Sequence, residues 1–274
     1  MLLFTWLFFV RFVFVWYLMS FYMLVKVKYI CVLIVILLTI ATFNVNAISL
    51  TSNRIYLDNN NRVASFIVLN RSLTAEECRL SFRYFEFDNA AVMGKELTDT
   101  LPSNNTSKTV KFSPRRFSIA AGKSQAIRLS LRRSADTDKA EYHSYLSVSC
   151  GKISPPTPNL VNVAPRLVHN VPIVARTAKL NAQASFTNVK LLDNGKVSFR
   201  LNREGNRSIY GDLEVLNKRT GKKVNGLKSI SIYTQSSYRD FEFSVPVNLA
   251  ESDISLRFTE VEKYGGSLTV THND

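Results

Sequence analysis

Several features that mark large classes of proteins are missing from this 274-residue sequence. No apolar run of 18 or more residues occurs after Ala47, which excludes a membrane protein with several helical spans. No stretch carries a helical period over three turns, so a helical core is not expected. Apolar residues nevertheless alternate through most of the chain, which excludes general disorder. The sequence therefore predicts a folded protein built from short, non-helical elements.

Signatures of enzymes and metal sites are missing as well. The three histidines, His143, His169 and His272, are scattered without the spacing of metal ligands. There is no GxSxG motif and no glycine-rich phosphate loop. No CxxC motif or Cys/His cluster suggests a zinc site or a redox enzyme. We therefore expect no catalytic activity, no small-molecule substrate, no metal and no cofactor.

Positive charge is in excess, with 35 Lys and Arg against 21 Asp and Glu and a net charge of +14. Three of these charges, Arg11, Lys26 and Lys28, lie in residues 1–47, which contain no acidic residue. Elsewhere the basic residues alternate along expected strands, as Arg79 and Arg83 do, which is typical of a solvated sheet face. Together with the export expected below, this argues against a nucleic-acid partner.

The first 47 residues read as an export segment. From Met23 a short basic region leads into an apolar core (ICVLIVILLTIA) and a polar exit with small or β-branched residues at Val45 and Ala47. This is the pattern of a secretory signal cleaved after Ala47. Residues 1–22 then precede the true start at Met23, or alternatively form an extra apolar segment that retains the protein in a membrane.

From Ile48 onward, nearly every segment has the two-residue period of β-strands. Seven candidate strands at roughly 10–15-residue spacing occupy residues 48–176, and a second set follows Lys179. Asn194–Gly195 and Thr220–Gly221 are typical hairpin turns. The sequence predicts an all-β protein with two immunoglobulin-like sandwiches, residues 48–178 and 179–274.

Cys78 and Cys150 are the cysteines that remain once Cys31 is assigned to the export segment. Two cysteines in an oxidising compartment favour a disulfide, although two buried thiols are the alternative. Cys78 opens the third strand and Cys150 closes the sixth. These strands are antiparallel neighbours in a seven-strand sandwich, so the disulfide agrees with the expected topology.

The first domain resembles the periplasmic assembly chaperones of the pilus chaperone–usher pathway. The resemblance covers nearly all of residues 48–176, whereas the second domain matches only loosely. The order and spacing of the matching segments together are more specific than any single motif among them. The matching segments are residues 48–55 (ISLTSNRI), 112–119 (FSPRRFSI), 122–129 (GKSQAIRL), 142–146 (YHSYL) and 171–176 (VPIVAR).

The resemblance implies that the seventh strand is donated to an incomplete pilus subunit. The expected donor residues share one parity: Val161, Val163, Leu167, Val171 and Ile173. They could equally face the protein's own core, and both can hold for different parts of the strand. Because Pro165 and Pro172 have opposite parity, we expect either a bulge between them or a strand that becomes regular only after Pro165.

The resemblance also implies two basic residues that clamp the carboxylate at the end of the subunit. Arg54 matches the arginine of the first strand, and Pro172 stands where the family has its lysine. Arg176 is our expected second anchor, with Arg166 and Lys179 as further options. The alternative for Arg54 is a solvated strand residue or an interdomain ion pair.

The resemblance taken as a whole implies an exported, boomerang-like chaperone located in the periplasm. Its implied partners are pilus or fimbrial subunits and an outer-membrane usher, to which it would deliver them without ATP or a cofactor. The alternative from another class is a structural or adhesive surface or pilus protein built from the same domains.

Overall fold

The computed structural model of the chain describes residues 48–132, 140–152, 166–246 and 249–273. The expected export segment and the donor residues Val161 and Val163 lie outside the described residues. Residues 47–274 form one compact unit, which is almost entirely β-structure. Among the described residues, no helix is long and apolar enough to cross a membrane.

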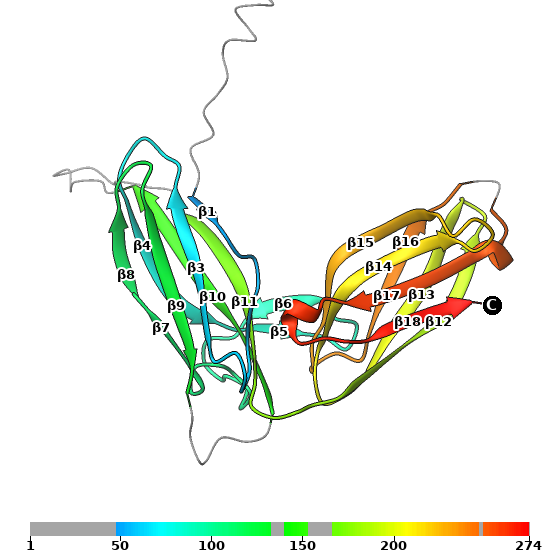
Figure 1. Cartoon of the computed structure of the whole chain (residues 1–274), viewed down its shortest axis with the longest axis horizontal. Helices are drawn as coiled ribbons and strands as arrows, with labels where there is room; N and C mark the ends of the chain where they lie inside the picture. Colours follow the sequence, from blue (N-terminus) through cyan, green and yellow to red (C-terminus); the bar gives the residue numbers. More distant parts are fainter. Residues whose placement is uncertain (1–47, 133–139, 153–165, 247–248, 274) are drawn as a thin grey trace, which may run out of the picture. The chain divides into compact units, whose positions relative to one another are not determined.

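The first sandwich consists of a four-stranded and a five-stranded sheet (Figure 1). The four-stranded sheet has the order β1 (Ile48–Leu50), β3 (Val63–Asn70), β9 (Ser124–Leu131), β7 (Val110–Ser113). The five-stranded sheet has the order β2 (Ile55–Leu57), β11 (Leu167–Arg176), β10 (Glu141–Lys152), β4 (Glu76–Arg83), β8 (Arg116–Ile119). The chain changes sheets between β1 and β2, and again between β7 and β8, where the Ser113–Pro114 peptide is cis.

Alternating apolar residues from both sheets form one core between them. Phe66, Ile127 and Leu129 point inward from the first sheet, and Leu146 and Ile173 from the second. Each fully buried side chain of this size contributes about 1.5–3 kcal/mol relative to its exposed form. The core also contains the Cys78–Cys150 disulfide, which confirms the pairing expected from the sequence.

The second sandwich follows after residue 181 and has its own buried cluster, with Phe199, Leu213 and Phe258 among its members. Its three-stranded sheet has the order β12 (Ala182–Leu192), β13 (Lys196–Gly205), β16 (Tyr238–Ser244). Its four-stranded sheet has the order β15 (Lys223–Ile232), β14 (Ile209–Asn217), β17 (Ile254–Glu260), β18 (Thr269–Asn273). Two short 3₁₀ helices, η1 (Glu251–Asp253) and η2 (Glu262–Tyr264), flank β17.

The strand set agrees with the sequence prediction of two β-sandwiches. The expected turns at Gly195 and Gly221 are present, and both glycines have positive φ, 71° and 66°. The domain border expected between residues 178 and 179 stays a prediction; the sheets of the two sandwiches end at Arg176 and begin at Ala182. One element was not expected, a hairpin of β5 (Phe85–Phe87) and β6 (Met93–Glu96).

Candidate functional site

Along the first half of β11, the outer edge has no neighbouring strand within the described part of the chain. β11 pairs with β10 over its whole length, from Leu167 opposite Cys150 to Arg176 opposite Glu141. On its other side β2 pairs with Ile173–Ala175 only. Among the described residues, no strand pairs with the outer edge of residues 167–172. Leu167 and Val168 in this stretch are 46% and 40% exposed.

The structure divides the expected donor residues into two groups. Val171 and Ile173 are 3% and 0% exposed and belong to the core of the first sandwich. Leu167 has the same parity but stays exposed. Val161 and Val163 lie outside the described residues. Of the described donor candidates, only Leu167 is thus available to a partner without a change in the core.

Pro172 lies within a regular ladder, opposite Tyr145. The ladder of β10 and β11 shows no register shift from Leu167 to Arg176. Pro165 lies outside the described residues, so our two alternatives for the strand around it stay a prediction. A proline inside a strand fits an edge that lacks a neighbour at this position.

Arg54 lies directly before β2 and is 4% exposed. Its Nη1 donates to Ser231 Oγ at 3.0 Å and to Tyr233 OH at 3.4 Å. Its guanidinium carbon lies 4.0 Å from the ring centroid of Tyr210. Its Nε has no hydrogen-bond partner, and Arg54 makes no ion pair with any described residue. The side chain is thus a buried cation held by hydroxyls and aromatic rings.

A buried charge without a counter-ion is unfavourable, because its desolvation is not offset by an opposite charge. The Tyr210 ring offsets part of this cost through a cation–π contact. The remaining N–H donors of Arg54 are suited to a planar anion, since a guanidinium can bind a carboxylate through two parallel hydrogen bonds. The geometry therefore favours a carboxylate ligand at Arg54.

Two titratable groups near Arg54, His143 and Tyr145, have shifted pKa values. His143 is 1% exposed and stacks on Tyr233, with 3.8 Å between the ring centroids. Burial, and then the charge of Arg54, lower the pKa of His143 to about 3, so the ring is neutral. Burial and the neighbouring Tyr233 raise the pKa of Tyr145. No titration of these groups near neutral pH can supply a counter-ion to Arg54.

Arg176, the expected second anchor, is already bound to other groups. Its Nε donates to Glu141 Oε2 at 2.8 Å, and both side chains are buried. Its Nη1 donates to Gly265 O at 2.6 Å and its Nη2 to Ser208 O at 3.1 Å. Glu141 also accepts the Ser208 backbone N–H at 3.0 Å. These contacts place Arg176 in a structural ion pair.

The two further options differ in their contacts. Arg166 donates to Ser149 Oγ, Ser149 O and Glu77 O at 3.1–3.3 Å. Lys179 is exposed, and no ion pair or hydrogen bond joins its ammonium to another described residue. Lys179 therefore keeps its donors for a ligand, whereas Arg166 uses its own within the sheet.

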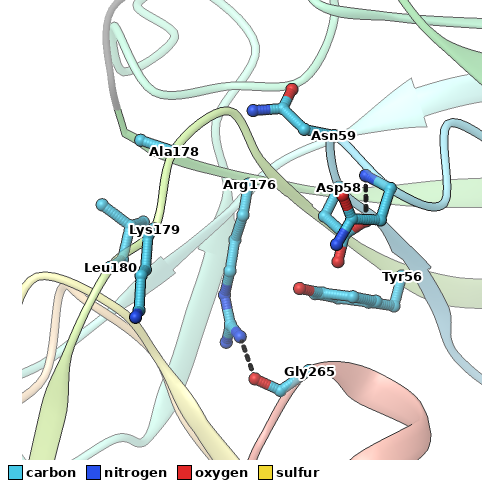
Figure 2. Close-up of a pocket in the computed structure, with 9 residues that line it drawn as sticks. Tyr56, Asp58, Asn59, Arg176, Ala178, Lys179, Leu180 and Gly265 are labelled. Atoms are coloured by element: carbon cyan, nitrogen blue, oxygen red, sulfur yellow. Dashed lines mark hydrogen bonds between the residues drawn. The ribbon is translucent and has the colours of Figure 1, made fainter.

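Arg176 and Lys179 line one pocket of about 420 Å³ (Figure 2). Tyr56 forms another wall, with its ring beside the Arg176 guanidinium, 5.2 Å from ring centroid to guanidinium carbon. Burial raises the pKa of Tyr56, while Arg176 lowers it and Asp58 raises it. The hydroxyl is therefore a neutral donor. Gly265 closes the pocket, and a Cβ there would lie 2.1 Å from Tyr56 OH.

From the sequence, neither Glu141 and His143 nor the tyrosines of the second sandwich were predicted to be site residues. Glu141 could have been paired with Arg176, since the two lie opposite each other at the ends of adjacent strands. Tyr210 and Tyr233 gave no signal, because only tertiary contacts bring them to Arg54. No group of three or more acidic, His or Cys side chains in the described part of the chain could hold a metal ion.

Comparison with known proteins gives similarity in structure only. No protein-family model and no curated protein sequence matches this chain. Among solved structures, one chain of the Salmonella enterica SafA pilin–SafB chaperone complex is 10% identical, with a TM-score of 0.48. The alignment covers 85% of this chain and 99% of that one.

Two further structures are similar. The CsuC–CsuE chaperone–tip adhesion subunit complex of Acinetobacter baumannii archaic Csu pili is 12% identical, with a TM-score of 0.47 and coverage of 82% and 97%. The YadV chaperone is 14% identical, with a TM-score of 0.45 and coverage of 82% and 98%. At these identities and TM-scores the likeness carries no argument, and function must rest on the residues described above.

Proposed function

We propose that this protein is an exported chaperone that binds pilus or fimbrial subunits by donating β11, and that it hands them to an outer-membrane usher. The observation that carries the proposal is the outer edge of residues 167–172, which no strand among the residues that the structure describes covers, together with exposed Leu167 and Val168. The sequence resemblance of residues 48–176 supports the same function. The mechanism needs no ATP and no cofactor, and the compartment would be the periplasm.

A free strand edge can complete a sheet that lacks a strand. Its unpaired N–H and C=O groups bind the backbone of the incoming sandwich, and its apolar side chains enter that sandwich's open core. Leu167 would fill such a slot. Val161 and Val163 would extend the donor face, whereas Val171 and Ile173 would hold the strand to its own domain. β11 would then contribute side chains to two cores, that of its own sandwich and that of the subunit.

Arg54 would bind the carboxylate at the end of the subunit, which would supply the counter-ion that this buried cation lacks. The second contact is assigned to the Arg176–Lys179 pocket. Lys179 would contribute the free donors there, while Arg176 stays in its ion pair with Glu141 and forms part of the pocket wall. The pocket lies near Arg54, because two of its lining residues, Tyr56 and Gly265, are close to that arginine. Tyr56 is two residues after Arg54 in the chain. Tyr264, the neighbour of Gly265, has its ring centroid 5.9 Å from the Arg54 guanidinium carbon.

The donor role is tested by co-expressing the chain in a periplasm with exported sandwich proteins that lack their last strand. A one-to-one complex is expected for the native chain. Replacing both Leu167 and Val168 by Asp should abolish it, because charges cannot enter an apolar slot. Val63→Asp is the matched control, since Val63 is 51% exposed on a strand of the other sheet. Equal binding by the double variant and the control would contradict donation.

The anchor role is tested with Arg54→Ala and with Lys179→Ala. Loss of a charge-assisted contact to a carboxylate costs about 1.5–3 kcal/mol, which is about 10- to 100-fold in affinity. Arg128→Ala is the control, because Arg128 is an exposed strand arginine of the same sandwich. Arg54→Ala protein that still protected its subunit from proteolysis at the native level would refute the anchor. Polymers of the native chain on the cell surface would favour the structural or adhesive alternative.

A further inference from the structure

Three strands of the first sandwich meet in one row where β11 begins. Cys78 in β4 lies opposite Cys150 in β10, and Cys150 lies opposite Leu167, the first residue of β11. The disulfide joins the first two strands of this row, and both cysteines are buried. The covalent link thus fixes the pair of strands against which the donor strand starts.

The side chain of Arg166 also reaches across β10 and β4, next to this row of residues. It is the residue before β11, and its guanidinium donates to Ser149 Oγ and O in β10 and to Glu77 O in β4. Ser149 precedes Cys150 and Glu77 precedes Cys78, so the side chain spans both strands beside the disulfide. Arg166 binds the backbone carbonyl of Glu77, whereas the Glu77 carboxylate contacts Arg79 at 3.5 Å.

This end of β11 needs such support more than the other end. Residues 173–175 are enclosed by β10 and β2 and are fully buried. Residues 167–170 pair with β10 and with no other described strand, and they are mostly exposed. Strand ends with few buried contacts open locally at low free-energy cost. A donor strand that is often open would bind more weakly, in proportion to the fraction of time it is formed.

We propose that Arg166 and the Cys78–Cys150 disulfide form a clamp that keeps residues 167–170 in strand conformation, ready for subunit capture. Arg166 is then a positioning residue that does not touch the subunit itself. The consequence is that capture depends on oxidation of a disulfide that lies outside the donor strand. The inference rests on the proposed function, because it concerns the order of the proposed donor edge.

The first test is amide hydrogen exchange of the secreted protein alone, without a subunit. Arg166→Gln should speed exchange of the protected amides in residues 167–170 by about tenfold, which is the effect of losing one or two hydrogen bonds. Exchange in residues 173–175 should not change. Arg128→Gln is the matched control. Replacing both Cys78 and Cys150 by Ala should give the same local pattern, and Arg166→Gln keeps the test valid if that double variant folds poorly.

The second test measures subunit capture by the same variants. Capture should weaken by the factor by which the formed fraction of residues 167–170, calculated from the exchange data, decreases, and Arg166→Lys should restore part of it. Unchanged exchange in residues 167–170 would overturn the clamp, whatever the capture result. A clearly lower formed fraction together with native capture would also overturn it. If the native chain captures no subunit, the proposed function fails, while the exchange data still decide whether the clamp exists.

Discussion

Four arginines in the described part of the chain are nearly fully buried, and they differ in the groups that bind their guanidinium. Arg176 and Arg207 are paired with Glu141 and Glu260. Arg203 donates to backbone carbonyls, among them Ser236 O at 2.9 Å. Arg54 has neither a carboxylate nor a carbonyl, only hydroxyls and ring faces. This contrast is the reason to assign a ligand to Arg54 and a structural role to the other three.

His143 gives a prediction for the pH dependence of stability. Its pKa is about 3 in the folded protein, lowered by burial and by Arg54, and about 6.5 in the unfolded chain. Between these values the unfolded state binds the proton and the folded state does not. The free energy of unfolding should therefore fall as the pH decreases from 6.5 towards 3, with a contribution from this group of about 1.4 kcal/mol per pH unit.

The measurement compares the native chain with His143→Phe, which keeps an aromatic ring beside Tyr233 but cannot titrate. Urea unfolding between pH 4 and 7 should show a smaller slope for the variant than for the native chain. Carboxylates and the other histidines contribute equally to both proteins, so they cancel in the difference. Identical slopes would mean that His143 is protonated in the folded protein.

At the scale of elements, alternation of apolar residues was sufficient to predict the two sandwiches. It identified strands as different as β3 and β13, because each has one face in a core. The β5–β6 hairpin was not predicted, since its turn has no glycine at the position with positive φ: the φ of 59° falls on Ala91, and Asp88 accepts the Val92 N–H. Its second strand is exposed throughout, so no burial pattern marks it.

The candidate site was predictable only where the strand order alone determines it. The disulfide follows from counting strands in a sandwich. The pairing of β2 with Ile173–Ala175, which covers part of the outer edge of β11, does not. The role of Arg176 does not, since its partners Ser208 and Gly265 come from the second sandwich and are distant in sequence. The two-residue period of the strand also could not show that Val171 and Ile173 are buried in the core of their own sandwich.

A second prediction concerns the close approach of β14 and β17. A Cβ at Gly211 would lie 2.2 Å from Thr259 O and 2.8 Å from Phe258 Cζ, both parts of β17. Gly211→Ala should therefore separate the strands and lower the free energy of unfolding by about 1–3 kcal/mol. Gly94→Ala is the control, because its Cβ would only meet the exposed Glu86 side chain at 3.2 Å. Equal stability of the two variants in urea unfolding would contradict this packing.

At the scale of the whole molecule, residues of the two sandwiches are joined by hydrogen bonds within one compact unit. Glu141 and Arg176 bind Ser208 and Gly265, and the hairpin region adds Ser236 Oγ to Asp88 O at 2.6 Å. The Glu141–Arg176 ion pair and the bond from the Ser208 N–H to Glu141 are buried, so they have a large share in coupling the two cores. We therefore expect the native chain to unfold in a single transition.

Arg176→Ala should break this coupling. The substitution leaves Glu141 as a buried charge without its cation, which typically costs about 3–5 kcal/mol. It also removes the donors to Ser208 and Gly265. In scanning calorimetry the transition should shift to lower temperature and separate into two, one for each core. Arg200→Ala removes an ion pair with Asp240 whose side chains are 31% and 58% exposed, and such pairs contribute at most about 1 kcal/mol. A single transition for both variants would show that the coupling between the cores does not depend on the buried ion pair.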